Sequence, residues 1–128
     1  MPVVVPADPE KTVVDFIHAL IPTLPDLSGW TVSTKIPDGV TPVKRIAVRS
    51  IGGSDEQFVA DRPRLDIRVW GDGTEANRSR ISRLILAHLR RQFRCRTFAA
   101  PVPLPDPADN TKTLTLFSVE LLLRGTQS

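Results

Sequence analysis

The chain is poor in the residues on which most protein chemistry depends. Its 128 residues include one cysteine, Cys95, and two histidines, His18 and His88. A single cysteine cannot form an internal disulfide, and these three residues do not have the spacing of a zinc site. A lone cysteine also fits synthesis in a reducing cytoplasm. The sequence therefore predicts a fold without disulfides or bound metal.

Long apolar runs and aromatic residues are also scarce. No apolar run approaches the roughly 20 residues that a membrane-spanning helix needs. Residues 1–6 lack the basic start and the apolar core of a signal peptide. Aromatic residues make up 5% of the chain, which leaves few side chains on which nucleic-acid bases could stack. We therefore expect no contact with a membrane.

Catalytic motifs are missing as well. Residues 71–74, Gly-Asp-Gly-Thr, lack the further glycine and the lysine of a phosphate-binding loop. Cys95 has an arginine on each side, which could lower the pKa of its thiol. A carboxylate site could form from Asp66 and Glu120, but neither acid lies in a local motif. The sequence predicts no enzyme and no cofactor.

The composition is that of an ordinary globular protein, with 41% hydrophobic and 24% charged residues. A chain of this length is one domain, here residues 1–128, and can bury a core without covalent staples. The net charge of +3 is unevenly spread, since residues 76–105 contain many arginines and no acid. Such a basic segment is either a solvated helix face whose arginines pair with acids of neighbouring elements or subunits, or a surface that attracts nucleic acid. We favour the first, because stacking residues are few.

Residues 62–70 form the clearest strand in the sequence. Leu65, Ile67 and Val69 alternate with a second set of side chains, so that one side of the strand is apolar and the other mostly charged. The second set is Arg64, Asp66, Arg68 and Trp70.

A long basic helix follows this strand. Asp72 or Thr74 can cap a helix that begins at Glu75. From there the apolar residues recur at helical spacing, as Ile81, Leu84, Ile85, His88, Leu89 and Phe93. The opposite face is predicted to carry Arg78, Arg83, Arg90, Arg91 and Arg94.

The remaining segments complete an α+β pattern. An earlier helix begins after the cap residue Asp8 and ends before Pro22. Strands are expected at residues 30–36, 43–51 and 112–124, with a turn at Asp109–Asn110. Residues 98–104 are limited by their prolines to an edge strand or a stiff connector. The sequence predicts a two-layer domain in which two helices pack on one face of a mixed sheet of four to five strands.

The loop at residues 52–61 is a candidate contact with a neighbouring protein. Its glycines give it reach, Asp55 and Glu56 give it charge, and Phe58 gives it an apolar anchor. The alternative is a surface loop without a partner.

The strand and turn from Arg62 to Thr74 read Arg-Pro-Arg-Leu-Asp-Ile-Arg-Val-Trp-Gly-Asp-Gly-Thr. Together with the helix at 75–93 and the late strand at 114–124, this segment resembles the tail terminator proteins of long-tailed bacteriophages. It is most similar to those of phages that infect actinobacteria. The resemblance covers most of the chain in the order of its elements.

The resemblance implies a structural virion protein at the head–tail junction, made in the cytoplasm of the host bacterium. Six copies would form a ring on the end of the tail tube, stop its polymerisation and join it to the head. The partners would be other copies of the chain, the major tail tube protein and a head-completion or connector protein. Genome DNA would pass through the ring without specific binding.

A ring subunit needs side surfaces that fit head to tail around an axis. Arg64, Asp66 and Arg68 can supply paired charges across such a joint, without an apolar patch that would precipitate the free subunit. Arg83 and Arg90 are expected to pair with acids of an adjoining protein. We do not expect them to line the channel, because a tight ring of arginines would retain phosphates.

Two other interpretations stay open. The chain could be another neck component of the same kind of virion, such as a head-closure protein. It could also be a nucleic-acid-binding module that uses the arginine helix. Strong DNA affinity that falls steeply with salt would favour the module.

Overall fold

The computed structural model describes residues 4–5, 8–35, 44–54, 60–71, 74–106, 109–121, 123–124 and 126–127. Two α-helices and two short 3-10 helices alternate with strands along the chain. The elements in order are β1 Val4–Val5, α1 Pro9–Leu20, η1 Ile21–Thr23, η2 Pro25–Leu27, β2 Thr31–Ser33, β3 Arg45–Ser54, β4 Ala60–Trp70, α2 Glu75–Gln92, β5 Cys95–Asp106, β6 Asp109–Leu121, β7 Leu123–Arg124 and β8 Thr126–Gln127.

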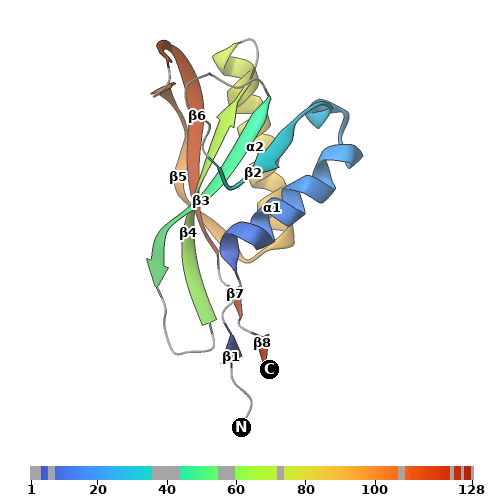
Figure 1. The fold of residues 1–128 in the computed structure, drawn as a ribbon, viewed down its shortest axis with the longest axis vertical. Coiled ribbons are helices and arrows are strands. Elements are labelled where there is room, and N and C mark those ends of the chain that lie inside the picture. The colour runs from blue at the N-terminus through green and yellow to red at the C-terminus, as the bar shows by residue number, and fades with distance from the viewer. Residues whose placement is uncertain are drawn as a thin grey trace.

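The main sheet is mixed and has the strand order β2-β3-β4-β6-β5. β2 pairs in parallel with β3, and every other neighbouring pair on this path is antiparallel. β7 continues along β4 beyond the end of β6, and β1 pairs with β8, so that the two ends of the chain lie close together (Figure 1). This arrangement confirms the predicted α+β fold with a mixed sheet of about five strands.

Both helices pack on the same side of the sheet (Figure 1). The core between the layers contains Val13 and Ile17 of α1 and Ile85 and Leu89 of α2, all with no exposed surface. The sheet contributes the apolar residues of three central strands to the same core, namely Ile46, Val48, Leu65, Ile67, Val69, Phe117, Val119 and Leu121. The predicted burial of the apolar side of β4 is therefore confirmed.

The first turn of each α-helix is capped as its sequence predicts. The Asp8 carboxylate accepts a hydrogen bond from the backbone N–H of Lys11 at 3.1 Å. The Thr74 hydroxyl accepts one from the backbone N–H of Asn77 at 3.2 Å. Each bond satisfies an N–H group that has no partner inside its helix, which fixes where the helix begins. Thr74 is thus the cap of α2, and Asp72 lies outside the described residues.

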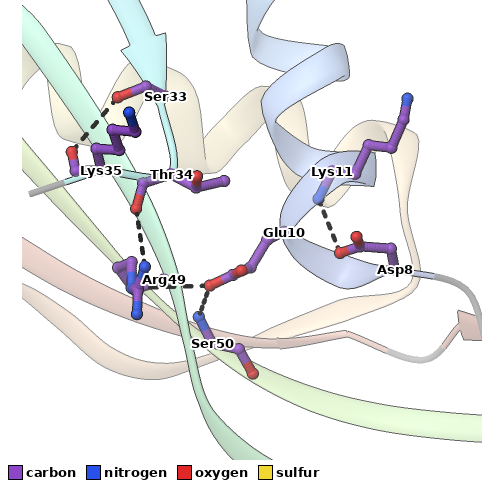
Figure 2. A network of polar contacts seen from close by, with 8 residues as sticks. All are labelled: Asp8, Glu10, Lys11, Ser33, Thr34, Lys35, Arg49 and Ser50. Atoms are coloured by element: carbon purple, nitrogen blue, oxygen red, sulfur yellow. Dashed lines mark hydrogen bonds and ion pairs between the residues drawn. The ribbon is translucent and has the colours of Figure 1, made fainter.

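An acidic side chain of α1 covers the outer edge of β3. β2 pairs with β3 only from Arg45 to Ala47, so within the described residues the later part of that edge has no strand beside it. There the Glu10 carboxylate accepts a hydrogen bond from the backbone N–H of Ser50 at 2.7 Å. Figure 2 shows Arg49 beside the same carboxylate, with its guanidinium also donating to the carbonyl of Thr34. Glu10 therefore blunts a strand edge that could otherwise pair with another chain.

Some element boundaries differ from those that the sequence predicts. Asp109 and Asn110 are the first residues of β6, so the expected turn at this position is wrong. β5 is a full edge strand that extends beyond the expected residues at both ends. β5 tolerates its prolines because it lies at the edge of the sheet, where half of its N–H groups have no strand to bond. No helix among the described residues is long and apolar enough to cross a membrane.

Replacing Ile67 with Asp tests the packing of the central strand. Ile67 has no exposed surface, so the variant would place an uncompensated carboxylate in the core. We expect a loss of about 3 to 5 kcal/mol in the free energy of unfolding, measured by urea denaturation. The control Ile67→Val should cost only about 0.5 to 1.5 kcal/mol. Equal stability of the Asp and Val variants would show that the strand register is wrong.

Candidate interaction surface

The side of the sheet that faces away from both helices carries the most unusual surface of the molecule. We call it the outer face. Its residues alternate with the core residues along each strand, and they include Arg45, Ala47 and Arg49 of β3, Arg64, Asp66, Arg68 and Trp70 of β4, Leu114, Leu116, Ser118 and Glu120 of β6, and Arg96, Phe98, Val102 and Leu104 of β5.

One half of the outer face is apolar. Trp70 packs with Ala47 and Leu114 in a second, smaller cluster, and the side chain of Leu116 lies against it, partly buried. Val102 pairs with Leu116 and Leu104 pairs with Leu114 across β5 and β6. These two β5 residues are 45% and 37% exposed, although they are large and apolar. The second cluster therefore continues into a patch that water covers in the single chain.

The other half of the outer face is a charge network centred on Glu120. The Glu120 carboxylate lies 3.4 Å from Nε of Arg64 and 3.3 Å from Nε of Arg96, which come from the strands on either side of it. The Arg64 guanidinium also lies over the ring of Phe98, 4.2 Å from its centroid, in a cation–π contact. Phe98 is nevertheless 48% exposed. The contact with Arg64 therefore positions this exposed ring on the outer face.

Asp66 and Glu120 both lie on the outer face, but each carboxylate already has partners. The Ser118 hydroxyl donates to Asp66 at 2.6 Å, while Glu120 is held by two arginines. Such contacts give each carboxylate a structural role in the sheet. Among the described residues no group of three or more His, Cys, Asp or Glu side chains could hold a metal ion.

The arginines of α2 divide into two groups. Arg83 and Arg90 are exposed, as the helical spacing predicts. Arg78 is 6% exposed, so its expected place on the exposed basic face is wrong. Its side chain packs against Gly71 and donates a hydrogen bond to the hydroxyl of Thr113. The backbone at Gly71 lets the aliphatic part of Arg78 approach, which turns the first turn of α2 toward the sheet.

Cys95 is half-buried where α2 passes into β5. Burial raises the pKa of its thiol from the ordinary value of 9.0, and the positive charge of Arg90 lowers the pKa by less. The expectation that flanking arginines lower the pKa of this thiol is therefore wrong, because removing a thiolate from water costs more than the nearby charge returns.

The predicted interface residues separate into three locations. Arg64, Asp66 and Arg68 lie together on the outer face, and Arg83 and Arg90 lie on α2, on the other side of the sheet. Asp55, Glu56 and Phe58 lie outside the described residues, so the predicted loop contact stays a prediction.

Sequence reasoning missed the apolar part of the outer face. It treated residues 98–104 as a proline-rich connector and expected a joint of paired charges alone. Phe98, Val102 and Leu104 are separated from Arg96 by even numbers of residues, so a period of two along β5 places all of them on one face, the outer face. The signal was therefore present in the sequence, but the prolines at 101, 103 and 105 favoured a connector over a strand.

Comparison with known proteins assigns the chain to no family. No model of a protein family matches the chain, and no curated protein matches it either.

Replacing Glu120 with Gln tests the charge network. The variant keeps the shape of the side chain but removes the charge that holds Arg64 and Arg96. Since both arginines are partly exposed, we expect a loss of about 1 kcal/mol at low salt and less at high salt. The control Asp15→Asn breaks the exposed pair with Lys11 and should cost less than the Glu120 variant, because solvent screens this pair more strongly. Thermal and urea unfolding of both variants would show whether the loss of unfolding free energy is larger for the Glu120 variant than for the Asp15 variant.

The pH dependence of Cys95 alkylation tests the electrostatics at the start of β5. Because the pKa of the thiol is raised, less thiolate forms at mildly alkaline pH than in an unfolded chain, and alkylation by iodoacetamide should be slower. Arg90→Gln removes a charge that lowers this pKa, so the alkylation profile should move to still higher pH. A shift to lower pH would contradict the assigned effect of Arg90.

Proposed function

We propose that the chain is a structural protein of a long-tailed phage virion, a tail terminator that forms a hexameric ring. The ring caps the tail tube, ends its polymerisation and joins it to the head-completion proteins. Support comes from the resemblance of residues 62–74 and of the element order to that family. The observation that carries the proposal is the outer face, a sheet surface with exposed apolar side chains beside a network of charges.

The outer face is suited to a joint between subunits. Phe98, Val102 and Leu104 would lose their exposed surface against a neighbour, which is the main favourable contribution to association. The charges around Glu120 would set the register of the joint and keep the free subunit soluble. The same surface cannot pair with itself in a ring of six, so the joint must be heterologous, with a different surface of the next copy against it.

The position of the basic helix agrees with a channel that does not bind DNA. Arg83 and Arg90 lie on the helical side of the sheet, whereas the proposed joint lies on the outer face. The two arginines are thus available to acids of an adjoining protein in the neck. In this proposal the genome passes through the ring without specific contacts.

The assembly itself is tested by the mass of the chain alone and after mixing with tail tubes of the same virion. Val102→Glu should remove assembly on the tubes while the variant keeps its fold, because it puts a charge in the centre of the apolar patch. Ala19→Glu, at an exposed position of α1 on the helical side, is the matched control and should assemble normally. Native mass spectrometry and cryo-imaging of capped tubes should show six copies, and one or three would defeat the hexamer.

The same experiment separates the alternatives. A head-closure or connector protein would bind the head side of the neck and leave tail tubes uncapped. A nucleic-acid-binding module would bind duplex DNA at moderate salt, with an affinity that falls steeply as salt is raised. Arg83→Ala with Arg90→Ala would then weaken DNA binding and leave assembly unchanged.

A further inference from the structure

A cleft of about 560 Å³ opens where α2 passes into β5. The cleft does not include Val102 or Leu104 of the apolar patch. It does share Arg96 and Glu120 with the charged half of the outer face. Its walls are formed by the last turn of α2, the first residues of β5 and the end of β6, and it is lined by Arg90, Phe93, Arg94, Cys95, Arg96 and Glu120.

The charge of the cleft is strongly positive. Its one acid, Glu120, is already shared between Arg96 and Arg64. In the part of the chain that the structure describes, neither Arg90 nor Arg94 makes an ion pair, and both side chains are exposed. The carbonyl end of α2 offsets part of the charge of Arg90, since cations are favoured at a helix C-terminus. Even so, the lining of the cleft holds three arginines and only one carboxylate to pair with them.

The floor of the cleft is apolar. Phe93 and Cys95 are half-buried there, and both pack against the main core. The Phe93 ring meets the edge of the Phe16 ring at a centroid distance of 5.4 Å. An occupant must therefore bring acids to the rim and small apolar groups to the floor.

We propose that this cleft binds an acidic peptide segment of a partner protein, with carboxylates on Arg90 and Arg94 and an apolar side chain above Phe93. The ion pair between Arg96 and Glu120 is an example, within the chain, of the arginine–carboxylate contact that the peptide would make. Carboxylates match the guanidinium geometry and can accept two hydrogen bonds from each group. The inference stands whether or not the chain forms a ring, because it concerns the chemistry of this cleft alone.

A peptide fits the cleft better than a nucleic acid does. Proteins that hold single strands combine a continuous basic groove with aromatic faces on which bases stack. Here the one aromatic ring in the lining is engaged by Phe16. Glu120 lines the cleft as well, and its carboxylate is bound by Arg96, so the lining already holds one carboxylate on an arginine.

Cys95 provides a direct test, because it is the only cysteine and it lines the cleft. The probe is a short synthetic peptide of alternating glutamate and valine, and the measurement is the rate of Cys95 alkylation by neutral iodoacetamide. At saturation the peptide should slow alkylation by about tenfold in low salt, and about 0.5 M salt should remove most of the protection. A peptide of alternating lysine and valine should give no protection.

Paired variants locate the site. Arg90→Gln with Arg94→Gln should remove the protection, expressed as the ratio of rates with and without peptide in each variant, so that any change in thiol pKa cancels. Arg83→Gln, exposed on the same helix but outside the cleft, should keep it. Circular dichroism checks that both variants are folded.

Three results with the wild-type chain, and one with the doubly substituted variant, would overturn the proposal. The first three are the absence of protection by the acidic peptide, equal protection by the lysine peptide, and stronger protection by oligothymidylate than by the acidic peptide. The last would assign the cleft to nucleic acid. Protection of the wild-type chain that survives in the doubly substituted variant would place the peptide elsewhere.

Discussion

β4 lies in the middle of the sheet, between β3 and β6. One of its sides faces the core under the helices, and the other forms part of the outer face. Leu65, Ile67 and Val69 are fully buried under the helices. Because side chains of a strand alternate, this burial forces Arg64, Asp66 and Arg68 onto the outer face. A slip of one residue would bury three charges and expose three aliphatic side chains. The register of β4 is thus fixed by the core, and every contact of the outer face follows from it.

The charges of the outer face are stabilised across strands and not along them. Glu120 of β6 is flanked by Arg64 of β4 and Arg96 of β5, so the network ties three neighbouring strands together. Each pair on its own contributes little, since the arginines are partly exposed. Their joint effect is to order a polar surface beside an apolar one. A surface with this division can stay soluble alone and still bury apolar area against a partner.

Much of the fold could be predicted from local sequence, because its periods are regular where the core is formed. The period of two in β4 and the helical period of α1 and α2 place most apolar side chains in the core, although Leu86 is buried there and Leu84, which the helical spacing assigns to the apolar face, is not part of the core cluster. Asp8 and Thr74 mark the helix starts. Arg78 could not be placed this way. Its spacing assigns it to the solvent side of α2. Its side chain is nevertheless buried, because it contacts Gly71, which precedes the helix, and Thr113 of β6. The position of Phe98 on the outer face follows from its spacing of two from Arg96, once residues 95–106 are recognised as a strand.

The edges of the sheet favour assembly through faces. At one side Glu10 occupies the free N–H of Ser50 and β2 is only three residues long. At the other, Pro101, Pro103 and Pro105 interrupt the outer edge of β5, and three register shifts distort it. Each of these features hinders the addition of a further strand. If neighbouring subunits met by extending the sheet, such features would oppose the joint. In the proposed ring the outer face, with the exposed side chains of Phe98, Val102 and Leu104, would therefore meet the next copy.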